Sequence, residues 1–284
     1  MSKVDGVFIC LTLILITLFG LCLSVGMVSP SPTEGFDQPT RPGPFIMYLP
    51  FVQRALYPPP PPTPTYEQEV VELVNQERAA RGLPPLKICP ELMAAASGHS
   101  QDMATNDFFS HIGSDGSSPW DRFRREGYQL TYGGEDIAAG DTTPHEVVSG
   151  WMSSPGHSGV ILDPRYREVG VGYAYSSFGH FWTLDVASRD GVYPLVIEGE
   201  ALVTTSRDVD LYVYGAEWAT QIRVSNESTF EDTSWEAYTP ARIWTLTPGP
   251  GWKTVYVELQ HEDGAILAAA DDIYLANPEP PPYP

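Results

Sequence analysis

The apolar positions of the chain follow three patterns in succession. Residues 7–28 are almost continuously apolar, and residues 66–153 carry apolar side chains at helical spacing. From residue 168 onward, apolar side chains alternate with small or polar ones, as they do in strands. The order of these patterns predicts helices first and strands later, which is typical of an α+β arrangement.

The helical part begins with a well-marked segment. In TYEQEVVELVNQERAARG, which ends at Gly82, the residues Val70, Val71 and Val74 form an apolar stripe, and the glycine ends the helix. Further helices are expected to start near Pro90, Pro119 and Pro144. Before the last of these, Thr143 and Glu146 have the spacing of a capping box.

Two kinds of strand pattern follow. The run EVGVGYAYSSFGHFWTLDVAS predicts two strands around a turn, which complete an α+β domain over residues 66–188. After Asp190, short β-rich runs recur with turn residues between them, and we expect an all-β sandwich over residues 190–277. Residues 278–284, PEPPPYP, form a Pro-rich tail.

The N-terminal segments indicate export. Residues 1–28 hold 22 apolar or small residues after Lys3, so they are either a cleaved signal peptide or an uncleaved membrane anchor. Either form places the rest of the chain outside the cytoplasm. Residues 29–65 are rich in Pro, Ser and Thr, which is typical of an extended linker. We therefore expect an extracellular or cell-surface protein.

The net charge and the cysteine content exclude one class of partner and internal disulfides. The formal net charge is −20, and such acidity repels phosphate backbones, so nucleic acid is not an expected partner. Of the three cysteines, only Cys89 lies beyond the first apolar run, so the exported part can form no internal disulfide. We expect Cys89 to be a core residue rather than a nucleophile.

Three titratable residues in the segment 109–162 are the candidates for chemistry. His111, Glu135 and His157 lie among Gly- and Pro-containing turns, which can aim side chains into a cleft. Two imidazoles and a carboxylate can bind a divalent metal such as zinc, and without a metal they can act as acid, base and orienting group. They can also form the polar floor of a ligand site. Their separations of 24 and 22 residues match no metalloprotease helix motif.

Two more polar residues precede this segment on the second expected helix. His99 and Asp102 lie three residues apart and share a helix face. We interpret them chiefly as packing residues with local hydrogen bonds. Asp102 could also orient His111 from behind.

Several motifs of residues 66–188 carry a resemblance to a known family. They are, in order, VVELVNQERAARGLPPL, HSQDMATNDFFSHIG, DRFRREGY, GGEDIA, VVSGWMSSPGHSGVILDPRYREVGVGY and FWTLDVA. This region resembles the CAP superfamily of cysteine-rich secretory, antigen 5 and pathogenesis-related 1 proteins, most closely its bacterial SCP branch. The resemblance implies an α-β-α sandwich with a central cleft, in which His111, Glu135 and His157 match the family's two histidines and one glutamate.

The chain departs from the family pattern at the site. Ser154 stands where eukaryotic members have a second glutamate, and Glu146 nearby is better explained as a capping residue. Asp136 replaces the usual Asn after Glu135, and Val160 replaces an Asn after the second histidine. The resemblance therefore implies a site that is altered or incomplete, with His111 and His157 as the metal ligands if a metal binds. No cofactor is required.

These observations leave three functions open. The leading one is a secreted or surface-tethered protein whose His/Glu-lined cleft binds a small apolar or lipid-like ligand, or an extracellular partner. The alternative is an extracellular hydrolase or protease that uses His111, Glu135 and His157, although no motif places a Ser or Cys nucleophile. The third is a purely structural surface protein. The C-terminal part resembles immunoglobulin-like β-sandwich modules, which implies a spacer or adhesive role.

Overall fold

The computed structural model describes residues 60–277, and residues 60–65 form neither helix nor strand. The apolar segment 1–28, most of the Pro-rich segment 29–65 and the tail 278–284 lie outside the described residues. Within residues 60–277, no helix is both long and apolar enough to cross a membrane.

A four-stranded sheet forms the centre of the first half. Its strands stand in the order β1 (Lys87–Ile88), β3 (Glu168–Ser176), β4 (Gly179–Ser188) and β2 (Tyr132–Ala139). The last three pair antiparallel, and only the short β1 is parallel to its neighbour. Strand β2 is therefore an edge strand, open on one side to loops and side chains.

Five helices accompany this sheet: α1 (Tyr66–Ala79), α2 (Pro90–Asn106), α3 (Pro119–Arg125), α4 (Pro144–Ser153) and α5 (Pro155–Ile161). The first four begin where the sequence predicts. The side chains of Thr65, Ser118 and Thr143 cap α1, α3 and α4, each by accepting a backbone N–H three residues on. Ser118 and Asp121 form a full capping box.

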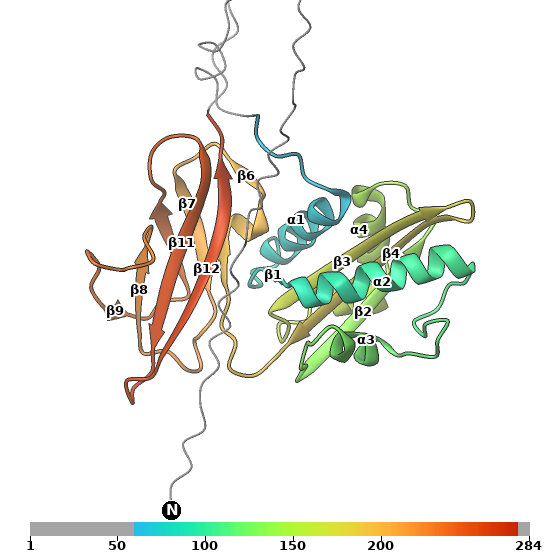
Figure 1. The fold of residues 1–284 in the computed structure, drawn as a ribbon, viewed down its shortest axis with the longest axis horizontal. Coiled ribbons are helices and arrows are strands. Elements are labelled where there is room, and N and C mark those ends of the chain that lie inside the picture. The colour runs from blue at the N-terminus through green and yellow to red at the C-terminus, as the bar shows by residue number, and fades with distance from the viewer. Residues whose placement is uncertain (1–59, 278–284) are drawn as a thin grey trace, which may run out of the picture. The chain divides into compact units, whose positions relative to one another are not determined.

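The helices cover both faces of the sheet (Figure 1). On one face, Val171, Trp182 and Leu184 join a core with the apolar residues of α1, α4 and α5. On the other face, α2 and α3 pack over the alternate residues of the same strands. Period-two alternation in β3 and β4 therefore produces three layers, helix, sheet and helix.

Two glycines allow α2 to approach the sheet. A Cβ atom at Gly172 would lie 2.2 Å from the carbonyl carbon of Ala96, and one at Gly170 would lie 2.1 Å from that of Leu92. The alternating Val-Gly-Val-Gly run of β3 thus presents apolar side chains to α1 and bare backbone to α2. This close contact fixes the helix that precedes the candidate site.

Three local expectations need correction. Glu135 lies in the strand β2 and not in a turn, because its neighbours pair with β4 along eight residues. Helix α5, which carries His157, was not expected. Glu146 makes an incomplete capping box, since its carboxylate accepts from the backbone and hydroxyl of Thr142 rather than from the backbone of Thr143.

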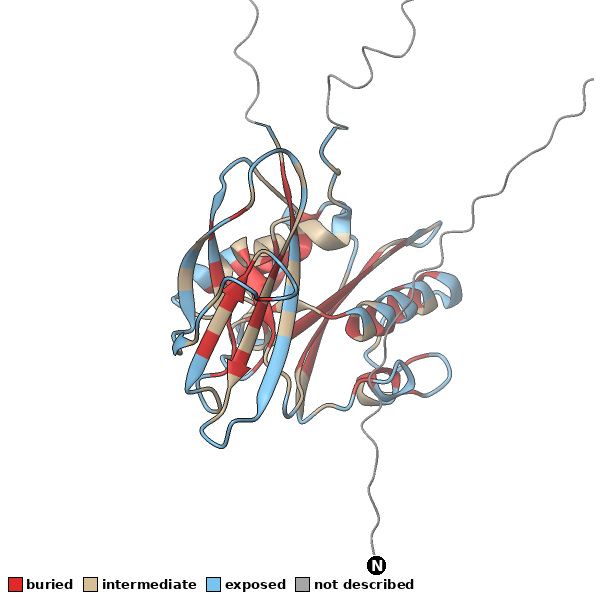
Figure 2. Cartoon of the chain, turned by 60° about the vertical axis from the view of Figure 1, so that its left-hand side comes forward, coloured by how far each residue is buried: buried red, intermediate tan, exposed pale blue. Residues whose placement is uncertain are grey.

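Residues 195–275 contain strands and one short 3₁₀ turn, η1 (Glu198–Glu200). One sheet has the order β10-β7-β5, and the other has the order β6-β12-β11-β8-β9. The strands are β5 (Leu195–Ile197), β6 (Val203–Thr204), β7 (Asp208–Val213), β8 (Gln221–Ser225), β9 (Glu236–Ala237), β10 (Ala241–Thr245), β11 (Gly251–Gln260) and β12 (Ile266–Leu275). Their inward-facing residues share one apolar core, and Figure 2 shows the buried positions along these strands and along the first sheet.

Hydrogen bonds and ion pairs join the two halves of the described chain. Asn75 of α1 donates to the carbonyl oxygen of Gly199 over 2.8 Å. The ammonium group of Lys87 pairs with Glu200 at 2.9 Å and with Asp271 of β12. All three charged side chains are largely buried, so removing one would leave the others without compensation.

Candidate functional site

The candidate site is built around His111, in the loop between α2 and α3. Its Nδ1 lies 2.7 Å from Oε1 of Glu135. The His111 side chain is 51% exposed, whereas that of Glu135 is 2% exposed. Because a carboxylate only accepts hydrogen bonds, His111 donates from Nδ1, which leaves Nε2 as the ring nitrogen that Glu135 does not engage.

A third residue, Arg122 of α3, holds the glutamate from the other side. Its Nη2 donates to Oε2 of Glu135 over 2.5 Å, and its Nη1 donates to the backbone carbonyls of His111 and Ser117. The guanidinium is almost as buried as the carboxylate. Arg122 therefore neutralises Glu135 and ties the His111 loop to α3, which keeps the imidazole in one orientation.

The remaining residue of the predicted trio, His157, is not hydrogen-bonded to this pair. His157 lies on α5, whose Ile161 belongs to the core on the opposite face of the sheet from α3. Within residues 60–277, His157 makes no hydrogen bond or ion pair with either His111 or Glu135. The structure thus joins two of the three predicted residues by a direct hydrogen bond, and the place of His157 in the site stays a prediction.

The geometry also tests the predicted metal site. Among the described residues, no three His, Cys, Asp or Glu side chains are grouped so that they could hold a metal ion. Both oxygens of Glu135 are already bound, one to His111 and one to Arg122. These residues therefore do not fit a three-ligand zinc centre, and a site made of His111 and His157 alone stays a prediction for elemental analysis.

Asp102 does not orient His111, contrary to one sequence-based expectation. Its two oxygens accept from the backbone and hydroxyl of Ser114 and from the amide of Asn106. These bonds pin the start of the 113–117 loop to α2. Glu135 takes the orienting role instead, because the strand β2 brings it beneath the imidazole.

His99 and Cys89 are buried, as expected. The Nε2 of His99 donates to the carbonyl of Ser110, which anchors the residue before His111. Burial lowers the pKa of His99, so the ring is neutral. Burial also raises the pKa of the Cys89 thiol, first through desolvation and then through its hydrogen bond to Glu91, which removes it as a nucleophile.

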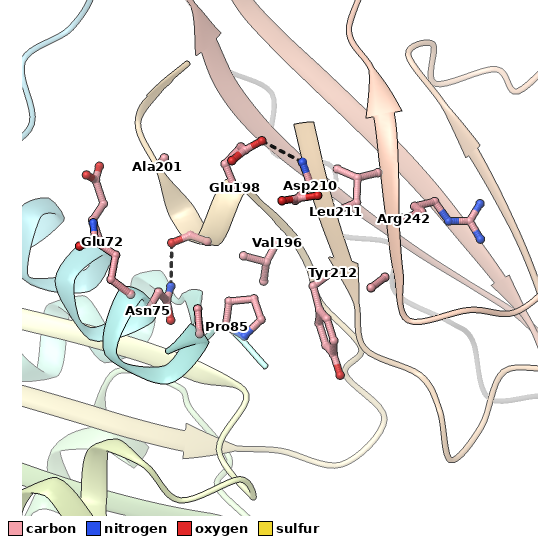
Figure 3. A pocket seen from close by; sticks show the side chains of 14 residues that line it. Glu72, Asn75, Pro85, Val196, Glu198, Ala201, Asp210, Leu211, Tyr212 and Arg242 are labelled. Atoms are coloured by element: carbon pink, nitrogen blue, oxygen red, sulfur yellow. Dashed lines mark hydrogen bonds between the residues drawn. The ribbon is translucent and has the colours of Figure 1, made fainter. Parts of the chain in front are cut away.

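Two cavities are alternative candidate sites, and neither is lined by His111. A polar cavity of about 260 Å³ between α2 and the loop before α3 is lined by His99, Asp102 and Arg122, among others. A cavity of about 370 Å³ lies beside α1, and Figure 3 shows its lining. Two of its polar side chains are already paired: Asn75 donates to Gly199, and Glu198 accepts from the backbone of Asp210.

Sequence reasoning missed Arg122 and a second buried acid, Asp185 of β4. Asp185 lies directly opposite Glu135 in the β2–β4 register and is fully buried. One signal for it was available, because Asp185 is a charged residue inside the otherwise apolar run FWTLDVA. Arg122 had no such signal, since it is followed closely by Arg124 and Arg125, which are both exposed.

Comparison with known proteins identifies the part of the chain that carries this site. Residues 71–186 match the family model described as CAP, the cysteine-rich secretory protein family. An uncharacterized protein of Bacillus subtilis, YkwD, is 44% identical over 118 residues, which are 42% of this chain and 45% of that protein. The uncharacterized membrane protein YlbC of the same organism is 33% identical over 108 residues, 38% of this chain and 31% of that protein.

A solved structure is also similar. An extracellular protein containing a SCP domain from Bacillus anthracis has 29% identity and a TM-score of 0.41, and the match covers 44% of this chain and 40% of that one. The chain spans less than half the length of the two curated relatives that it matches. Residues 71–186 thus match the CAP family, and this part of the chain is similar in sequence to the bacterial proteins named above.

Proposed function

We propose that the CAP domain is a binding domain in which His111 receives the hydroxyl head of an apolar, lipid-like ligand. The observation that carries the proposal is the position of the imidazole. Its inner nitrogen is held by the buried Glu135, while its outer nitrogen belongs to a half-exposed ring. In its neutral form, an imidazole held in this way offers one oriented hydrogen-bond acceptor, Nε2, to a ligand.

The surroundings of His111 suit the apolar part of such a ligand. Phe109 is 54% exposed and Ile112 is 49% exposed, one on each side of His111 in the chain. Large apolar side chains that gather at a polar group on the surface often mark a binding site. A ligand with one hydroxyl and an apolar body would satisfy the imidazole and cover both side chains.

The hydrolase alternative finds less support. Within residues 60–277, no Ser, Thr or Cys side chain is hydrogen-bonded to a histidine, so no activated nucleophile accompanies the His111–Glu135 pair. The pair could still act as a general base toward water. Turnover in the binding assay below would support that alternative.

The rest of the chain supports a location at the cell surface. Residues 1–28 are apolar enough to direct export or to anchor the chain, and residues 29–65 have the composition of a spacer. We place the binding domain at residues 66–188 and regard residues 190–277 as an immunoglobulin-like spacer module. An acidic chain of this kind is not expected to bind nucleic acid.

A matched set of ligands tests the proposal. A long-chain fatty alcohol, its methyl ether and the corresponding alkane differ only in the head group, and each can be titrated calorimetrically into the purified protein. We expect the alcohol to bind most tightly, and His111→Ala to weaken it about tenfold, the effect of one hydrogen bond. His145→Ala removes an exposed histidine on α4 and serves as the control. Equal binding of alcohol and ether, or an unchanged affinity in His111→Ala, would refute the proposal.

A further inference from the structure

A second carboxyl group lies beneath the candidate site and accepts no hydrogen bond from an N–H or hydroxyl group. Asp185 is completely buried on β4, and neither of its oxygens accepts a hydrogen bond from any donor. Among the described residues, it is the only carboxylic acid with both oxygens in this state. A buried polar group without a partner is rare in folded proteins, and each case calls for an explanation.

The strand register shows which group faces it. Glu135 of β2 and Asp185 of β4 are direct partners in the antiparallel pair, so their side chains emerge side by side on the same face of the sheet. That face is covered by α2 and α3. Two carboxyl groups are therefore enclosed together in a layer without exposed surface.

Two carboxylates in such a place cannot both be charged. Their repulsion and the loss of solvation both favour protonation of one of them. Glu135 accepts from His111 and from Arg122, and these two donors stabilise its charge. Asp185 has no such donor, so the proton belongs on Asp185.

We propose that Asp185 is a neutral acid that donates its proton to Glu135 in a hydrogen bond, and that it thereby acts as a positioning residue for His111. Glu135 then receives three donors, from a strand, a helix and a loop, and stays a carboxylate in one orientation. Burial, followed by the negative charge of Glu135, raises the pKa of Asp185 well above its ordinary value, which agrees with this placement of the proton.

The other charged and titratable groups near the pair are consistent with the assignment. Arg122 from α3 faces Glu135 and balances its charge. His99 from α2 is neutral, since burial lowers its pKa. The enclosed group of Asp185, Glu135, Arg122 and His99 is therefore neutral overall, whereas an ionised Asp185 would leave one uncompensated negative charge in it.

The proposal deepens the proposed function, and it rests on that function only for the claim that His111 meets a ligand. Without Asp185 as donor, Glu135 has one hydrogen bond fewer and can rotate away from the imidazole. The Nδ1–H proton of His111 would then be less protected, and Nε2 would be less well aimed. Proton position and proton exchange can be measured without any ligand.

Carboxyl and imidazole NMR on the full-length chain test the proposal. The carboxyl carbon of Asp185, assigned by its loss in Asp185→Asn, is expected at the chemical shift of a neutral acid at about pH 7. The Asn variant keeps an N–H donor for Glu135, so the exchange rate of the His111 Nδ1–H should change less than about twofold. In Asp185→Leu, which has a similar volume and no donor, exchange should become about tenfold faster.

Asp136→Asn is the matched control, because Asp136 is buried on the opposite face of β2. It should leave the exchange of His111 unchanged. A carboxylate chemical shift for Asp185, or equal exchange rates in the Asn and Leu variants, would overturn the proposal. If the Leu variant does not fold, the carboxyl shift of the wild type decides alone. If Asp185 is neutral but the fatty alcohol does not bind, only the proposed function fails.

Discussion

Replacing Asp136 by Asn should make the protein more stable, and increasingly so as the pH rises. Asp136 is 1% exposed and lies on β2 beside Glu135, with its side chain on the opposite face of the sheet. Its Oδ2 is buried without a hydrogen-bond donor. Burial, and then the charge of Glu135, raise the pKa of Asp136 to about 8 from the ordinary value of 3.8.

The raised pKa converts into a change of stability with pH. Between about pH 4 and pH 8 the folded chain keeps a proton that the unfolded chain releases, so the free energy of unfolding falls as the pH rises. Each pH unit in this window lowers the free energy of unfolding by about 1.4 kcal/mol, so the total loss by pH 7 is at most about 4 kcal/mol. Asn cannot ionise but must still bury its amide, so we expect a gain of about 1–4 kcal/mol at pH 7.

Urea unfolding of both proteins at several pH values measures this difference. The curves of unfolding free energy should nearly meet at about pH 4 and separate steadily up to about pH 8. Asp190→Asn, which removes a carboxylate from an exposed position, controls for the general effect of the charge. A difference between wild type and Asp136→Asn that does not depend on pH would refute the reasoning.

Two further substitutions test the packing and the join between the two halves. Gly172→Ala places a Cβ atom 2.2 Å from the carbonyl carbon of Ala96, so α2 or β3 must shift. Thermal unfolding should show that the free energy of unfolding falls by about 1–3 kcal/mol or more. Lys87→Met leaves Glu200 and Asp271 buried together without a cation, and urea unfolding should show that the free energy of unfolding falls by about 3–5 kcal/mol. Adding Glu200→Gln to this variant should recover part of that loss. An unchanged stability in either single variant would contradict the corresponding contact.

Most helices and the longer strands of residues 66–188 could be predicted because their signals are local. Thr65, Ser118 and Thr143 precede helices that they cap, and the alternation in residues 168–188 gives β3 and β4. Strand β2 gave no such signal, since Glu135 and Asp136 place a buried acid on each of its faces. Helix α5 is seven residues long and begins Pro-Gly, which is too short for a helical pattern to appear.

The candidate site was predictable only in part, for a related reason. The motifs singled out His111 and Glu135, and the structure joins them. The partners Arg122 and Asp185 depend on strand register and on the packing of α3, which the sequence alone does not reveal. Asp102 was a plausible orienting group by position, but its oxygens are taken up by the loop that follows α2.

The most direct test of the account is to follow the ring nitrogens of His111 by NMR while a long-chain fatty alcohol is added. We predict that the Nε2 resonance moves toward that of a hydrogen-bonded acceptor, while Nδ1 keeps its proton and its bond to Glu135. The resonances of His145 should stay where they are. If His111 does not respond while the alcohol binds, or if His145 responds equally, the claim that His111 receives the ligand is wrong.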